Sequence, residues 1–148
     1  MDKVKFASYI FVVMAIAFVG LRLINLATKY GTIKIGDKKF NVEIAKNDWE
    51  LEKGLSGRRG LKTASGMFFV FPKSDYYGFW MKNMEFPLDI IWINNGKIVD
   101  MKKNVPVPTT KLLEKYVAVA PAKYVLEINA GLAERYEFKI GDEVELDI

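Results

Sequence analysis

The feature that most constrains the fold is a long apolar segment near the N-terminus. Residues 6–27 read FASYIFVVMAIAFVGLRLINLA, in which 18 of the 22 residues are apolar and only Arg22 is charged. As an α-helix this segment would rise about 33 Å, which is enough to cross the hydrocarbon core of a bilayer. The sequence therefore predicts an N-terminal membrane anchor within residues 1–28, followed by one domain over residues 29–148.

Two other interpretations of this segment stay open, a cleaved signal peptide and a buried core helix. A signal peptide has a shorter apolar run followed by a small-x-small cleavage site, and here Ala15-Ile16-Ala17 lies inside the run. A core helix has a polar stripe, which this segment lacks from Phe6 to Leu21. Lys3 and Lys5 precede the segment and favour an N-terminus inside the cell. We therefore expect a single-pass protein of the cell membrane with its domain on the extracytoplasmic side, and secretion after cleavage as the alternative.

The absence of two residue types excludes much chemistry. The chain has no Cys and no His, so it cannot build a thiolate nucleophile, a Ser-His-Asp triad, a Cys/His zinc site or a disulfide framework. The methionines of the apolar runs are interpreted as core residues rather than as copper ligands. We expect no metal and no cofactor. From residue 29 to the C-terminus there are 19 basic and 17 acidic residues, a balance that favours no nucleic-acid partner.

Short apolar runs alternate with turn signals throughout residues 30–148. This pattern predicts a mainly β fold, a single sandwich or barrel-like domain with two short helices, preceded by the N-terminal transmembrane helix. The predicted helices are 47–53 and 130–136. The predicted strands are 32–35, 40–44, 67–71, 79–84, 88–93, 98–101, 115–120, 124–128 and 144–148.

Asn95-Gly96 is a strong signal for a two-residue hairpin turn. Centring the hairpin there places Ile93 opposite Ile98, Ile91 opposite Asp100 and Asp89 opposite Lys102. One face of the hairpin then carries only apolar side chains. A slip of one residue would mix the two faces, so this register is preferred. The apolar face consists of Leu88, Ile90, Trp92, Val99 and Met101.

Charged and polar residues stand out in the apolar stretch FWMKNMEFPLD, residues 79–89. A buried charge needs a partner, because its desolvation is costly. In one interpretation Asp89 pairs with Lys102 across the hairpin and Lys82 extends to solvent. In the other, Arg58 or Arg59 from the glycine-rich loop 54–60 converges with Lys82, Asn83 and Asp89 beside Trp80 to form a polar pocket. Catalytic versions, a Ser56–Lys82 dyad or Asp89 and Glu127 as paired carboxylates, are possible but lack geometric support.

The motifs GLSGRRGL, GMFFVFP, FWMKNMEFPLDIIWI, NNGKIV, YVLEINAG and IGDEVEL occur in this order, and the chain from Phe40 onward resembles the family catalogued as domain of unknown function 192. The resemblance implies a mainly β domain that often follows a signal or membrane segment and has no established molecular function. Ser56 and Met84 depart from the family pattern, which usually has Met and Thr there. The matching positions are Gly54, Leu55, Arg58, Gly66, Met67, Phe79, Trp80, Met81, Lys82, Asn83, Pro87, Leu88, Asp89, Leu126, Glu127, Gly131, Gly141 and Asp142.

We therefore expect a membrane-tethered extracytoplasmic binding or interaction module with an unknown small-molecule or protein ligand. The alternative is a carboxylate- or Lys-dependent hydrolase that acts at the cell envelope, and a third possibility is a structural partner of a membrane enzyme. Residues 6–27 would provide the membrane contact. The candidate ligand-binding residues are Arg58, Trp80, Lys82, Asn83, Asp89 and Glu127.

Overall fold

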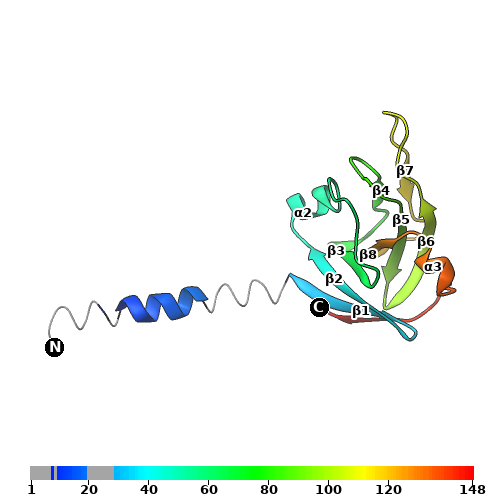
Figure 1. The fold of residues 1–148 in the computed structure, drawn as a ribbon. Helices are drawn as coiled ribbons and strands as arrows, with labels where there is room; N and C mark the ends of the chain where they lie inside the picture. The colour runs from blue at the N-terminus through cyan, green and yellow to red at the C-terminus, as the bar shows by residue number, and fades with distance from the viewer. Residues whose placement is uncertain (1–7, 9, 20–28) are drawn as a thin grey trace.

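The computed structural model describes residues 8, 10–19 and 29–148 (Figure 1). Residues 10–19 are helical and their large apolar side chains are exposed, so this part of the chain is not a buried core helix. The predicted anchor over residues 6–27 lies partly outside the described residues. Within the described ranges, no helix is both long enough and apolar enough to span a membrane.

The domain is mainly β, as predicted, and is built on a single curled sheet of seven strands (Figure 1). The strand order is β6-β5-β8-β3-β2-β1-β9, and a separate two-stranded ribbon pairs β4 with β7. All neighbours in the sheet are antiparallel except β2 and β3, which run parallel. The strands are β1 (Tyr30–Ile35), β2 (Lys38–Ala45), β3 (Ser65–Asp75), β4 (Gly78–Trp80), β5 (Leu88–Asn94), β6 (Lys97–Val105), β7 (Lys115–Val117), β8 (Ala122–Asn129) and β9 (Val144–Asp147).

The sheet curls into a half-barrel, and one end of the edge strand β6 contacts the chain just before the other edge strand, β9. Lys97 at the start of β6 forms a bridge with Glu143, next to β9. The N–H of Ile98 donates to the carbonyl of Asp142 at 3.0 Å, and the N–H of Gly141 donates back to Ile98 at 2.8 Å. One core cluster takes residues from β1, β2, β3, β5, β6, β8 and β9, so it fills the inside of the curl. These contacts leave the outer face of β3, β5 and β8 to be covered by other elements.

Two short helices lie on opposite sides of the sheet (Figure 1). Helix α2 (Asp48–Lys53) lies in the connection between the parallel strands β2 and β3, and Asn47 caps it in a reciprocal capping box with Glu50. Helix α3 (Leu132–Arg135) buries two of its residues in the inner core. Both helices confirm the predicted positions, with shorter bounds.

The predicted hairpin is correct at its turn and wrong further along. Ile93 lies opposite Ile98, as expected, but Trp92 rather than Ile91 lies opposite Asp100. A β-bulge at Val99 adds one residue to β6 and shifts every later pair. Met101 consequently packs with the inner core, not with the outer one.

The predicted strand over residues 79–84 is wrong beyond Trp80. The chain turns there, and Asn83 adopts a left-handed backbone with φ of 56°. Asn tolerates this conformation better than other residues with a side chain. Strand β4 is therefore short and pairs with β7 outside the main sheet.

Candidate functional site

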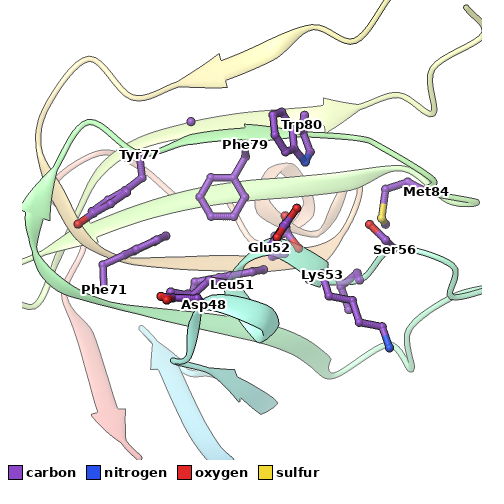
Figure 2. A pocket seen from close by; sticks show the side chains of 15 residues that line it. Asp48, Leu51, Glu52, Lys53, Ser56, Phe71, Tyr77, Phe79, Trp80 and Met84 are labelled. Carbon is purple, nitrogen blue, oxygen red and sulfur yellow. The ribbon is translucent and has the colours of Figure 1, made fainter. Parts of the chain in front are cut away.

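A groove of about 320 Å³ lies on the outer face of the sheet, between α2 and β4. Figure 2 shows the side chains of Tyr77, Phe79 and Trp80 on one side of it and those of α2 on the other. The capping box fixes where α2 begins, and the pairing of β4 with β7 fixes the opposite wall. The lining residues are Asp48, Leu51, Glu52, Lys53, Gly54, Leu55, Ser56, Phe69, Phe71, Tyr77, Gly78, Phe79, Trp80, Met84 and Glu127.

Aromatic contacts hold one wall of the groove in place. The ring of Phe79 meets Phe69 edge-on at a centroid distance of 4.9 Å, and meets Trp92 edge-on at 6.0 Å. Phe71 stacks on Tyr77 at 3.6 Å. The indole N–H of Trp92 donates to the carbonyl of Tyr77 at 3.1 Å, which ties the segment before β4 to the sheet. The wall is thus a rigid apolar surface, of the kind that binds organic rings.

Trp80 stands at the mouth of the groove and is 48% exposed. It follows the fixed Phe79 in β4, so its backbone is held although its ring remains open to solvent. An exposed aromatic ring beside a groove offers a contact face at little cost in conformational entropy.

Glu127 lines the groove from strand β8, in the middle of the sheet. It lies opposite Met67 of β3 and Ile90 of β5, and it is only 5% exposed. Burial raises the pKa of its carboxyl to about 8, because the charged form has lost water. The carboxyl is therefore mostly protonated at neutral pH, and it both donates and accepts hydrogen bonds in that form.

The Glu127 carboxyl has no partner among the described residues, from which it receives neither a hydrogen bond nor an ion pair. Every side-chain polar atom of those residues that is fully sealed from solvent does have a hydrogen-bond partner. The carboxyl of Glu127 is therefore not sealed in packed protein, and it meets the groove.

The opposite rim belongs to α2 and carries charge. Asp48, Glu52 and Lys53 are exposed there and line the groove. The ammonium of Lys53 lies 4.5 Å above the ring of Trp49, which is outside this groove. The two acids therefore dominate the charge of the rim.

Lys82 and Asn83 line a neighbouring hollow of about 330 Å³, which they share with Trp80 and Trp49. The Ser56 hydroxyl donates to the carbonyl of Lys82 at 2.8 Å. The N–H of Gly57 donates to the carbonyl of Asn83 at the same distance, so the glycine-rich loop packs against the turn after β4. This hollow adjoins the groove that contains Glu127, and the two share Glu52, Lys53, Ser56 and Trp80 as lining residues.

Arg58 pairs with Glu43 of β2 through two hydrogen bonds, one of them 2.8 Å from Nη2 to Oε2. The bidentate pair holds the pKa of Glu43 below its usual range and raises that of Arg58. Arg58 lines hollows on the other side of the glycine-rich loop. Its visible role is to tie that loop to the sheet.

Asp89 is fully buried and lies away from the groove. Its carboxylate accepts hydrogen bonds from the backbone N–H groups of Asn104, Gly131 and Ala133. The expected pair with Lys102 does not form, and the Lys102 ammonium instead lies 3.9 Å from Asp100. Asp89 therefore joins β5 to β6 and α3.

The structure thus brings together Trp80 and Glu127, and places Lys82 and Asn83 next to them. Sequence reasoning missed the α2 rim and the ring pair Phe71–Tyr77 as parts of the groove. Asn47 predicted that α2 forms, but no sequence signal indicated which surface the helix would cover. The described residues contain no group of His, Cys, Asp and Glu side chains that could hold a metal ion.

Comparisons with known proteins agree on the kind of domain. The model of the family DUF192, described as "Uncharacterized ACR", matches residues 31–146. A protein of unknown function from Novosphingobium aromaticivorans is 35% identical, with a TM-score of 0.69 over 78% of this chain and 83% of that one. A second solved structure, from Sinorhizobium meliloti, is 30% identical, with a TM-score of 0.68 over 79% of this chain and 92% of the other. That protein has been assigned a proposed role as a transcription regulator. No curated protein matches the chain.

Proposed function

The chain belongs to the uncharacterised DUF192 family, and we propose that the groove between Trp80 and Glu127 binds a small organic ligand. The observation that carries this proposal is the unpartnered carboxyl of Glu127 beneath an open aromatic groove. Apolar walls with a few convergent polar groups are typical of small-molecule sites. A buried acid with a strongly raised pKa also favours a functional site.

Folding alone gives no reason for an acid at position 127. An apolar side chain on the outer face of β8 would pack against the surrounding core, as Val125 does two residues earlier. A buried polar group without a hydrogen bond lowers stability instead. A ligand that hydrogen-bonds to the carboxyl would recover this loss in the bound state.

The hydrolase alternative depends on the other acids that line the groove. A glycosidase-type mechanism needs two carboxyl groups directed at one bond, with one kept protonated as the acid. Glu127 resembles such an acid, and the exposed Asp48 and Glu52 on the rim are the candidates for the second carboxyl group. The hydrolase alternative predicts release of the aryl group from aryl glycosides, with loss of that activity in Glu127→Gln.

We further propose that residues 6–27 tether the domain to the extracytoplasmic side of the cell membrane. The support is the apolar sequence with one charge in 22 residues. In fractionated cells, the full chain should sediment with membranes and resist carbonate extraction, whereas residues 29–148 alone should not. Extraction of the full chain by carbonate would contradict the tether.

The groove proposal is tested by a thermal-shift screen of a small-molecule library on the full chain in detergent. A ligand at about 100 times its Kd adds about 2.7 kcal/mol to the stability, which is a readily measured shift. Hits should stabilise the wild type and the Glu145→Gln control, which removes an exposed acid on β9. They should not stabilise Glu127→Gln or Trp80→Ala to the same extent. Hits that stabilise all four proteins equally, or a screen with no hits, would overturn the proposal.

A further inference from the structure

We propose that the ligand of this groove is an organic ammonium ion, an amine carried on an apolar or aromatic body. The inference rests on the proposed function of the groove and adds the chemical class of its ligand. Three observations carry it: the charge of the rim, the aromatic wall and the position of Glu127.

The charge of the lining favours a cation. Asp48 and Glu52 are exposed at the rim, and Lys53 is the one basic residue among the described residues that line the groove. The Lys53 ammonium already lies over the ring of Trp49. The rim therefore attracts cations and repels anions as they approach.

The aromatic wall suits the same class of ligand. The faces of aromatic rings attract ammonium groups, and the attraction increases when water is excluded. The exposed ring of Trp80 offers such a face at the mouth of the groove. Phe79, held edge-on by Phe69 and Trp92, gives the apolar body of the ligand a fixed surface.

Glu127 supplies the anionic partner from the sheet side of the groove. Its side chain is more than nine-tenths buried, meets the groove and has no partner among the described residues. An ammonium group that enters would give the carboxylate the counter-charge and the hydrogen bonds it lacks. A neutral ligand would gain a hydrogen bond but no ion pair. An anionic ligand would add a negative charge beside the acids of the rim and would gain no ion pair either.

Binding of an amine would then release a proton. The free protein holds the carboxyl of Glu127 in its neutral form at pH 7, since burial raises its pKa to about 8. The bound protein holds a carboxylate beside the ammonium, and the proton from the carboxyl passes to the buffer. The other titratable side chains that face the groove are Asp48, Glu52 and Lys53 of α2 and Tyr77 before β4. The neighbours of Glu127 on β3 and β5, Met67 and Ile90, do not titrate.

Isothermal titration calorimetry with three matched probes tests this inference on the full chain in detergent. Phenethylamine, phenethyl alcohol and hydrocinnamate share a phenyl body and present a cationic, a neutral and an anionic head. Phenethylamine should bind at least tenfold more tightly than the alcohol, and hydrocinnamate should bind most weakly. In buffers of different ionisation enthalpy, phenethylamine binding at pH 7 should release close to one proton. Its Kd should fall by about tenfold between pH 6 and pH 7, as one proton is released per binding event.

Two variants assign the effect to one residue. Glu127→Gln should weaken phenethylamine binding at least tenfold and remove both the proton release and the pH dependence. The same variant should change the Kd of phenethyl alcohol less than threefold. Glu145→Gln should behave as the wild type in every titration.

The outcomes separate the ligand class from the groove itself. If phenethyl alcohol binds as tightly as phenethylamine, or phenethylamine binding is insensitive to pH and to Glu127→Gln, the ammonium proposal is overturned. Hits of the library screen that depend on Glu127 would still support the groove as a binding site in that case. No phenethylamine binding and no Glu127-dependent hit would overturn both.

Discussion

The carboxylate of Asp89 accepts a hydrogen bond of 2.7 Å from the backbone N–H of Ala133, which lies far along the chain at α3. The same carboxylate accepts a 2.7 Å bond from the N–H of Asn104 and a longer one from Gly131. One buried acid therefore satisfies donors from the end of β6 and the start of α3. Asp89 and Glu127 are both buried acids, but only Asp89 is used by the fold.

Asp89→Ala should destabilise the domain strongly. It leaves several backbone N–H groups without their acceptor, and loss of a buried charged partner typically costs about 3 to 5 kcal/mol. Urea unfolding at neutral pH measures this loss. A change below about 1 kcal/mol would show that water replaces the carboxylate, and the structural role given to Asp89 would be wrong.

Arg58→Ala should lower stability by about 1 kcal/mol, because the ion pair with Glu43 is part-exposed. The pair lowers the pKa of Glu43, so its stabilisation is present above the usual pKa of a glutamate and is lost as the pH falls. The difference between wild type and Arg58→Ala should therefore shrink in acid. Unfolding curves at neutral pH and near pH 3 test this, and a difference independent of pH would contradict an ionic origin.

Trp80→Ala and Phe79→Ala should separate binding from folding. Trp80 is half exposed, so its loss should leave the melting temperature within a few degrees of the wild type and weaken ligand binding at least fivefold. Phe79 packs on Phe69 and Trp92, so its truncation should cost about 2 to 4 kcal/mol. Thermal melts and titrations of both variants check this. Equal effects of the two substitutions on stability would contradict the assignment.

The carboxyl of Glu127 should titrate near pH 8 in carbon-detected NMR, against an ordinary value of 4.5. Between these values the folded state keeps a proton that the unfolded state has released. Stability should therefore fall as the pH rises, by at most about 1.4 kcal/mol per pH unit from this group. Glu127→Gln should lack this slope. A midpoint near 4.5 would mean that water or a nearby charge solvates the carboxylate fully.

Local features of this chain could be predicted from the sequence, and contacts between distant segments could not. Asn95-Gly96 identified the turn because its backbone preference is local, and Asn47 identified α2 for the same reason. No turn residue marks the bulge at Val99. Two partners of Asp89, Gly131 and Ala133, lie 42 and 44 residues further along the chain. Sequence reasoning therefore recognised Asp89 as a buried charge but assigned it the wrong partner.

The candidate site shows the same limit. Trp80 and Glu127 stood out in the sequence only as candidate ligand-binding residues, and the structure places both in the lining of one groove. Arg58 and Asp89 stood out equally, and the fold uses both for its own contacts. What distinguishes the two cases is the partner that the fold supplies: Arg58 pairs with Glu43, Asp89 accepts from backbone N–H groups at β6 and α3, and Glu127 receives no such bond among the described residues.

The central claim is that Glu127 serves binding at the expense of folding, and urea unfolding of Glu127→Gln at pH 7 tests it most directly. The amide is nearly isosteric with the carboxyl and never ionises. At pH 7 ionisation of Glu127 stabilises the unfolded wild type relative to the folded one, and Glu127→Gln removes this stabilisation. The account predicts that Glu127→Gln is more stable than the wild type by about 1 to 3 kcal/mol, while Glu145→Gln is unchanged. A Glu127→Gln protein less stable than the wild type by more than about 1 kcal/mol would contradict the account, because Glu127 would then be a residue that the fold needs.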